Sequence, residues 1–251
     1  MKISTTVITF NEEENIKKCI ESVKSFSDEI ILVDSGSTDK TVEIAKRLNC
    51  KIFKRKFDNY AKQKNFAISK TKNDWIFSID ADEVASEELV KEIDFRFHEV
   101  DTADAYSIPR KNFILGKFIK HTRWQPELDR HVWLFNKTKA KWVGDVHEEV
   151  QVNGRVGKMK SAKLHYQDKT ISEFLSKLDK YSEIEAEILF KNKKRFSLLK
   201  AILQVKYNFF IRYIYRLGFL DGWRGFVLSY LMAIYHFEIW MKLWHLQEKT
   251  D

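Results

Sequence analysis

The chain contains few residues that crosslink or interrupt a fold, with two cysteines and two prolines among 251 residues. Cys19 and Cys50 form no C-x-x-C pair, so the sequence indicates neither a disulfide framework nor a cysteine-based zinc site. No apolar stretch of signal-peptide length precedes the acidic run that begins at Glu12, and we therefore expect no export. Together these absences favour the reducing cytoplasm.

Long hydrophobic runs are missing as well. The longest uncharged run covers residues 225–237, which is shorter than the ~20 apolar residues that a helix needs to cross a membrane. We therefore expect no membrane-spanning helix. Internal repeats and low-complexity linkers are also absent from the sequence.

Positive charge is concentrated near the C-terminus. The net charge is +8, and residues 191–251 alone hold 11 lysines and arginines against 4 acidic residues. A basic segment of this kind is compatible with a nucleic acid or with an anionic membrane surface.

The first hundred residues alternate between two patterns. Short apolar and β-branched runs predict strands at 4–10, 29–35, 51–57 and 75–80, and the segments after them predict helices. We expect Asn11 to cap the first helix and Ser37 or Thr38 to cap the second. A βα series of this kind implies an α/β fold, with a mostly parallel sheet flanked by helices, and ligands bind at the carboxyl ends of its strands.

Three carboxylates follow one of the predicted strands. The stretch WIFSIDADE (75–83) ends in Asp80, Asp82 and Glu83, and two carboxylates ~5 Å apart repel by roughly 3 kcal/mol at an effective dielectric near 20. Oxygen ligands at i and i+2 suit Mg²⁺ or Mn²⁺, although the alternative is a pair of solvated surface acids. Asp34 ends another strand, where it either faces the same ligand or caps the turn at Gly36.

The second half of the chain has a different pattern. Residues 104–110, 131–137 and 141–152 read as strands with longer connections, which predicts a mixed or antiparallel extension of the sheet. Thr170 and Glu173 have the spacing of a helical capping box. The apolar face expected for the helix that follows consists of Phe174, Leu178, Tyr181, Ile184 and Ile188.

The motifs TVITFNEEENI, EIILVDSGSTDKT, QKNFAI and WIFSIDADE, in this order, resemble family 2 glycosyltransferases of the GT-A fold. The later segments IPRKNFILGKFIKH, WQPELDRHVWLF, GDVHEEV and YRLGFLDGWRGF are similar to the bacterial lipopolysaccharide core glucosyltransferase group. The resemblance implies a catalytic domain over 1–168, with a nucleotide-sugar half (1–100) and an acceptor half (101–168). Residues 169–251 would form a helical, membrane-associating region.

The resemblance also implies the site residues and the cofactor. The donor is expected to be a UDP-sugar, with Asp34 near the base or ribose and Lys64 facing the nucleotide or its diphosphate. Asp82 would be the more direct ligand of a Mg²⁺ or Mn²⁺ ion, with Asp80 nearer the ribose and the metal. The nucleotide-binding positions that the resemblance implies are Thr9, Asn11, Glu12, Asp34, Lys64 and Asp80.

Family 2 enzymes generally invert the anomeric centre, so a general base for the acceptor hydroxyl is expected. Glu148 is the first candidate, His147 the second and Asp145 the third. Adjacent strand residues point to opposite faces, so only one of Glu148 and His147 can reach the acceptor. Trp133 stands where relatives often carry an arginine. Residues expected on the acceptor side are Arg110, Asn112 and Trp124, whereas Asp39 and Asn65 are expected to hold loops.

The basic tail has a mixed surface pattern. Across 197–217, polar residues recur every four positions on an otherwise apolar, aromatic helix, and they are Lys200, Gln204, Asn208, Arg212 and Arg216. We interpret this region as peripheral on the inner face of the cell membrane, where a lipid-linked saccharide acceptor would be met. The alternative is packing on the catalytic domain or on a second subunit, as a homo-oligomer.

Three other functions fit parts of the sequence. One is transfer to a polyprenyl phosphate, whose anionic acceptor needs no base. Another is a nucleic-acid-binding protein, although the polar stripe of the tail is narrow for a nucleic-acid groove. The last is a sugar-nucleotide-binding module without catalysis, against which the presence of Asp80, Asp82 and Glu148 argues.

Overall fold

The computed structural model describes residues 2–98, 103–144, 148–167 and 170–249. The chain forms two compact units, one from Met1–Lys111 with Pro126–His165 and the other from Asn112–Gln125 with Tyr166–Asp251. Residues 112–125 thus belong with the C-terminal helices, whereas the sequence placed them in the acceptor half. The domain boundary near 168 stays a prediction.

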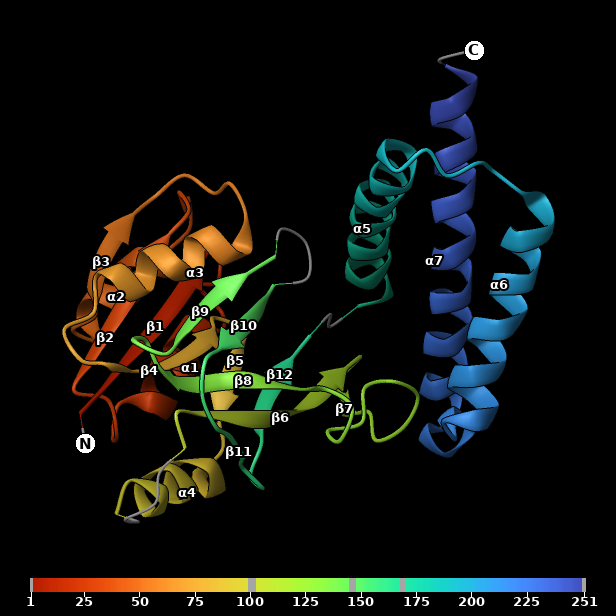
Figure 1. Cartoon of the computed structure of the whole chain (residues 1–251). Helices are drawn as coiled ribbons and strands as arrows, with labels where there is room; N and C mark the ends of the chain where they lie inside the picture. Colours follow the sequence, from red (N-terminus) through yellow and green to blue (C-terminus); the bar gives the residue numbers. More distant parts are fainter. Residues whose placement is uncertain (1, 99–102, 145–147, 168–169, 250–251) are drawn as a thin grey trace. The chain divides into compact units, whose positions relative to one another are not determined.

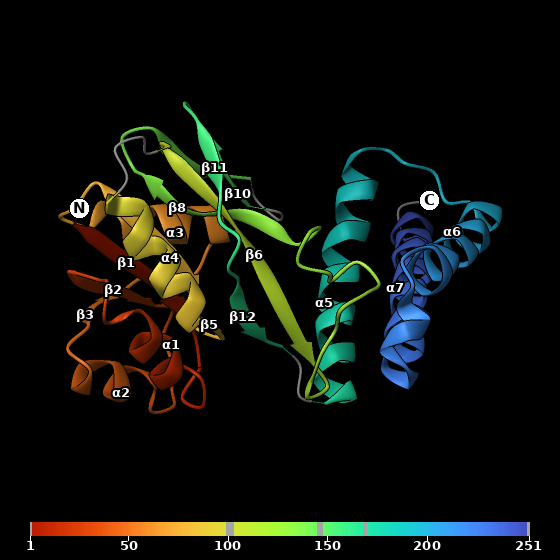
Figure 2. The ribbon, with the colours of Figure 1, turned by 90° about the horizontal axis from the view of Figure 1, so that it is seen from below.

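The first unit begins with four parallel strands in the order β3-β2-β1-β4, namely β1 (Ile3–Thr9), β2 (Glu29–Asp34), β3 (Lys51–Lys54) and β4 (Trp75–Asp80). Helices α1 (Ile16–Val23) and α2 (Thr41–Arg47) pack together on one face, and α3 (Tyr60–Ser69) covers the other (Figure 2). Because β1, β2 and β4 are covered on both faces, they consist of nearly continuous buried apolar or small residues.

The remaining strands make the sheet mixed, as the sequence predicted. Antiparallel β8 (Arg130–Asn136) follows β4, and β6 (Ala105–Ile114), β12 (Lys163–Tyr166) and β5 (Glu83–Ala85) continue the order. Two short strands, β7 (Lys117–Phe118) and β11 (Val156–Lys158), pair with β6. Strand β5 begins three residues after β4 ends, yet β8, β6 and β12 stand between them in the strand order, where β5 is last. The sheet therefore curls back on itself. Helix α4 (Glu87–His98) connects β5 to β6.

The expected strand over 141–152 is instead two strands. They are β9 (Ala140–Val143) and β10 (Glu149–Val152), which pair antiparallel in a separate two-stranded sheet. The connection between them contains residues 145–147, which lie outside the described part of the chain.

The predicted caps of the first two helices are wrong. Helix α1 begins after Asn15 with no acidic residue in its first turn. Asn11 lies five residues before the first helical residue, Ile16, and has a left-handed backbone conformation. Its side-chain oxygen accepts the Thr38 N–H at 2.9 Å. Neither Ser37 nor Thr38 caps α2; the Asp39 carboxylate accepts the Thr41 N–H instead. Asn11 and Asp39 therefore hold the two loops at the carboxyl ends of β1 and β2.

The second unit contains three long helices, α5 (Ile171–Lys191), α6 (Leu198–Phe210) and α7 (Trp223–Glu248). The predicted capping box of Thr170 and Glu173 is confirmed at the start of α5. Helix α7 packs between α5 and α6 (Figure 1) around Leu228, Ile239 and other apolar residues. A π-helical turn (Ile211–Tyr215) and a 3₁₀ turn (Gly218–Asp221) connect α6 to α7. In the described part of the chain, no helix combines the length and the apolar character that crossing a bilayer requires.

The buried face of α5 differs from the predicted one, and α6 buries part of its polar stripe. On α5, the buried row continues from Leu178 to Ser182 and Ala186, while Ile184 is 41 % exposed. On α6 the sequence pattern left the buried face open, and in the structure polar Asn208 is 5 % exposed whereas apolar Leu199 is 67 % exposed. Helix α6 therefore turns part of its polar stripe inward and presents an apolar face outward.

Candidate active site

The three carboxylates after β4 each have a different basic partner. Asp80, the last residue of β4, lies 3.1 Å from the Lys64 ammonium. Asp82 Oδ2 is 3.1 Å from His165 Nε2, and Glu83 forms a fully buried ion pair with Lys163. Distributing three carboxylates over three partners relieves the repulsion that the sequence alone would produce.

Lys64, on α3, joins the end of β4 to Glu148 just before β10. Its Nζ lies 3.1 Å from Asp80 Oδ1 and 3.0 Å from Glu148 Oε1, although the two acids are 68 residues apart in the chain. The lysine is buried, whereas the Asp80 and Glu148 side chains are 27 % and 18 % exposed. The predicted donor-side lysine, the β4 acid and the first candidate base are thus brought together.

These charges shift one another's protonation. Burial works to lower the pKa of Lys64, but Asp80 and Glu148 overcome it and raise that pKa above its ordinary value. Burial likewise works to raise the pKa of Asp80, but Lys64, with Lys163 beyond it, brings it down from 3.8 to about 2. At neutral pH the site therefore contains a buried ammonium beside a charged carboxylate.

Next to this pair lies a second group of charges, Glu83, Lys163, Arg110 and Asp129, of which the sequence analysis had not named Lys163 and Asp129. Burial lowers the pKa of Lys163 despite the Glu83 carboxylate beside it. Arg110 Nη1 lies 3.6 Å from Glu83, and the guanidinium binds both Asp129 oxygens at 2.8–3.1 Å. Glu83 was noted only as part of the acidic cluster, and Lys163 lies in a strand, β12, that no sequence pattern predicted.

Trp133 lies between the two lysines. Its ring centroid is 4.9 Å from Lys64 Nζ and 3.3 Å from Lys163 Nζ, and Trp142 lies 4.4 Å from Lys64 Nζ. The face of an indole attracts cations, most strongly where water is excluded. Trp133 therefore packs against buried positive charge, at a position where an arginine would be repelled.

The carboxylate oxygens of Asp80 and Asp82 fit a divalent cation whose coordination shell is completed by substrate oxygens. Asp80 and Asp82 are two residues apart at the strand end, and Asp82 is 27 % exposed. Across the described ranges, no three His, Cys, Asp or Glu side chains are grouped to hold a metal by themselves. Mg²⁺ is commonly held by one or two carboxylates with substrate phosphates and water, so this donor set fits such an ion.

The other nucleotide-side residues lie at the ends of β1 and β2. Asp34 is buried, and its carboxylate accepts the N–H groups of Gly36 and Ser37 at 3.0–3.2 Å. It therefore caps the turn at Gly36, which was one of the two roles considered for it. Glu12 donates its backbone N–H to the Thr41 hydroxyl. Thr9 Oγ1 is buried with no hydrogen-bond partner among the described residues. Contact of these residues with a nucleotide stays a prediction.

The residues expected on the acceptor side are divided between the units. Arg110 belongs to the first unit, and Asn112 and Trp124 belong to the second. Asn112 is buried and bonds the Trp124 carbonyl and Gln167. Asn65, on α3, makes two hydrogen bonds to the backbone of Trp142 in β9, so its partner is a strand and not the loop that was expected. The alternative bases His147 and Asp145 lie outside the described residues.

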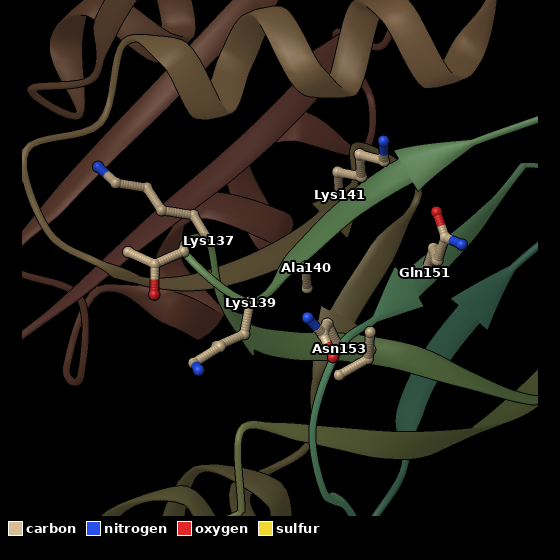
Figure 3. A pocket seen from close by; sticks show the side chains of 8 residues that line it. Lys137, Lys139, Ala140, Lys141, Gln151 and Asn153 are labelled. Atoms are coloured by element: carbon tan, nitrogen blue, oxygen red, sulfur yellow. The ribbon is translucent and has the colours of Figure 1, made fainter.

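An open pocket lies elsewhere in the first unit, at the turn between β8 and β9 and along β10 (Figure 3). Lys137, Lys139 and Lys141 line it, and their side chains point in different directions (Figure 3). Lys137 Nζ is bound to the Thr71 carbonyl. None of the predicted site residues lines this pocket.

Comparison with known proteins identifies the class. The profile of the family described as glycosyl transferase family 2 matches residues 4–151. The chain is 35 % identical, over 99 % of its length and 89 % of the relative, to a protein of Rickettsia typhi described as an uncharacterized glycosyltransferase. It is 28 % identical, over 94 % of its length and 90 % of the relative, to the lipopolysaccharide core biosynthesis glycosyltransferase LpsC of Rhizobium meliloti. The chain belongs to glycosyltransferase family 2.

Solved structures resemble part of the chain. Glucosyl-3-phosphoglycerate synthase of Mycobacterium tuberculosis, in complex with phosphoglyceric acid, is 21 % identical over 45 % of this chain and 44 % of that one, with a TM-score of 0.37. The same enzyme with Mn²⁺, UDP and glucosyl-3-phosphoglycerate is 22 % identical, with a TM-score of 0.36. This likeness is too partial to bear on function. Family membership and the mixed, curled α/β sheet together confirm the predicted fold class.

Proposed function

We propose that the protein transfers a hexose, glucose in the first instance, from a UDP-sugar to a lipid-linked glycan such as the lipopolysaccharide core, with inversion at the anomeric carbon. The observation that carries this proposal is the Lys64 ammonium between Asp80 and Glu148. It joins the strand end where the donor is expected to the acid expected to deprotonate the acceptor.

Each side chain then has a separate role. Asp82 and Asp80 would hold a Mg²⁺ or Mn²⁺ ion, which when bound stabilises negative charge on the departing diphosphate. Lys64 supplies a fixed positive charge beside Asp80, and Glu148 takes the proton of the attacking acceptor hydroxyl. Because a diphosphate would compete with Glu148 for Lys64, donor binding would weaken that ion pair and release the Glu148 carboxylate toward the acceptor hydroxyl.

The second unit supports work at a membrane surface. Helix α6 exposes a row of apolar residues at helical spacing, with Lys200 and Lys206 also exposed, and the row consists of Leu199, Leu203, Tyr207 and Phe210. Aromatic and apolar side chains with nearby lysines suit attachment to an anionic leaflet. We therefore infer a peripheral position on the inner face of the cell membrane.

Replacing Glu148 by glutamine tests the role of the base. In Glu148→Gln we expect sugar transfer to fall by about 10²–10⁴-fold, because the amide cannot accept the proton, while UDP binding persists. Glu149→Gln, an exposed neighbour on β10, is the matched control and should keep its activity. Full activity of Glu148→Gln would favour the alternative acceptor, a polyprenyl phosphate.

A separate assay of a panel of nucleotide sugars with Mg²⁺ or Mn²⁺ identifies the donor.

A further inference from the structure

Arg212, in the π-helical turn after α6, is a buried cation that forms no ion pair with the residues that the structure describes. It is 7 % exposed, and neither its Nε nor its Nη1 has a hydrogen-bond partner within the described ranges. Its guanidinium lies 5.1 Å from the centroid of the Trp124 ring. An isolated buried charge is among the most costly groups in a folded protein, so the protein has an unexplained cation here.

The charged groups near Arg212 do not neutralise it. Burial, and then the positive charge of Arg123, lower the pKa of Arg212 to about 10. Burial, and then Arg212 and Arg123, also lower the pKa of His236 to about 4. The buried carboxylate of Asp221 accepts the backbone N–H groups of Lys120 and His121.

Other buried polar atoms in this region also lack partners among the residues that the structure describes. They are Arg216 Nε, Thr122 Oγ1 and His236 Nδ1. Buried polar atoms are nearly always hydrogen-bonded, so a concentration of exceptions indicates a missing ion or ligand. Arg123 is exposed and Arg216 is partly exposed, and the basic cluster therefore extends from the surface to Arg212.

The backbone around this cluster is fixed before any ligand binds. The Thr122 N–H donates to the Arg216 carbonyl at 3.1 Å, which ties the loop after β7 to the π-helical turn. Gly218 allows close packing, since a Cβ there would lie 2.6 Å from the Arg212 carbonyl oxygen. The π turn is closed by the Arg216 N–H, which donates to the Ile211 carbonyl at 2.8 Å. Such turns occur frequently at functional sites.

Apolar side chains follow directly along the chain. Exposed large residues continue from the π turn to the start of α7, and they are Tyr215, Leu217, Phe219, Leu220 and Trp223. Guanidinium groups bind phosphate with charge-assisted hydrogen bonds. A ligand with a phosphate beside an apolar portion matches both features.

We propose that Arg212, with Arg123 and Arg216, binds the phosphate group of a lipid. The identity of this lipid, as the glycan acceptor or as a component of the membrane that holds it, rests on the proposed function. The contact between the arginines and a phosphate does not. It concerns the second unit alone, whereas the donor is expected in the first.

The test is calorimetric titration of the full chain with dihexanoyl phosphatidic acid below its micellar concentration. Arg212→Met should weaken binding about tenfold to a hundredfold, as loss of a charged hydrogen bond predicts. Without ligand, the same variant should melt at a higher temperature, because it removes an unpaired buried charge. Arg123→Gln, at an exposed position, should also weaken binding, whereas Arg195→Gln removes an exposed charge outside the cluster and should not.

Equal loss in Arg123→Gln and Arg195→Gln would overturn the proposal, since binding would then follow net charge alone. Unchanged binding by Arg212→Met would overturn it as well. Inorganic phosphate and dihexanoyl glycerol separate the two parts of the ligand, and tighter binding of phosphatidic acid than of either supports a lipid phosphate. Inorganic phosphate binding as tightly as phosphatidic acid would overturn the lipid source. UDP binding, measured in parallel, reports separately on the proposed glycosyl transfer.

Discussion

Removal of the Lys64 ammonium should destabilise the first unit strongly. Lys64→Met keeps a long apolar side chain beside Trp133 and Trp142 but leaves Asp80 and Glu148 without the charge 3.0–3.1 Å away. Breaking a buried ion pair on one side costs about 3–5 kcal/mol. Because both acids are partly exposed, we expect the lower end, about 3 kcal/mol, which is a large share of a typical stability of about 5–15 kcal/mol.

Urea unfolding at pH 7, followed by tryptophan fluorescence, measures this loss. Lys62→Met is the matched control on the same helix, since Lys62 is 64 % exposed and its removal should change the free energy of unfolding by less than about 0.5 kcal/mol. Equal stability of Lys64→Met and the wild type at pH 7 would refute the reasoning.

The same pair predicts a pH dependence. The pKa of Asp80 is depressed from 3.8 to about 2 in the folded state, so its contribution is complete above about pH 4 and is lost as the pH falls toward 2. The stability difference between the wild type and Lys64→Met should therefore be constant from pH 7 to about pH 5 and narrow below pH 4. A difference that stays constant down to pH 3 would contradict the charge pairing.

Two further predictions concern the second unit. Thr170→Ala removes the hydrogen bond that the Glu173 N–H donates to the Thr170 hydroxyl, one of the two bonds of the capping box, and should lower the free energy of unfolding by about 1 kcal/mol, measured by urea titration; no change would mean that this bond does not stabilise α5. Leu203→Asp places a charge on the exposed apolar face of α6 and should weaken binding to anionic vesicles by about tenfold, measured by co-sedimentation. Val156→Asp, at an exposed apolar residue of the first unit, is its control, and equal binding by both variants would exclude α6 as the contact.

The parallel half of the fold could be predicted from the sequence because local signals agree there. Strands β1, β2 and β4 are nearly continuous buried runs of apolar, β-branched and small residues, and helix α3 follows β3 as the alternating pattern predicted. The cap at Asn11 failed because that residue bonds Thr38 across a loop, 27 positions away. Such a tertiary contact leaves no local pattern.

The site was predicted in part for the same reason. Asp80 and Lys64 follow from motif and strand position, and their meeting with Glu148 follows only from the folded sheet. Lys163 was missed because β12 is four residues long and pairs with β5 only after the sheet curls. The inward turn of Asn208 and Arg212 was missed because periodicity identifies the stripe but does not indicate which face is buried.

Metal-assisted nucleotide binding at the end of β4 is tested most directly by titrating UDP calorimetrically with and without Mn²⁺. In the wild type we expect Mn²⁺ to tighten UDP binding by about tenfold or more. In the double variant Asp80→Asn with Asp82→Asn that gain should vanish. An undiminished gain in the double variant would show that these two aspartates do not hold the ion.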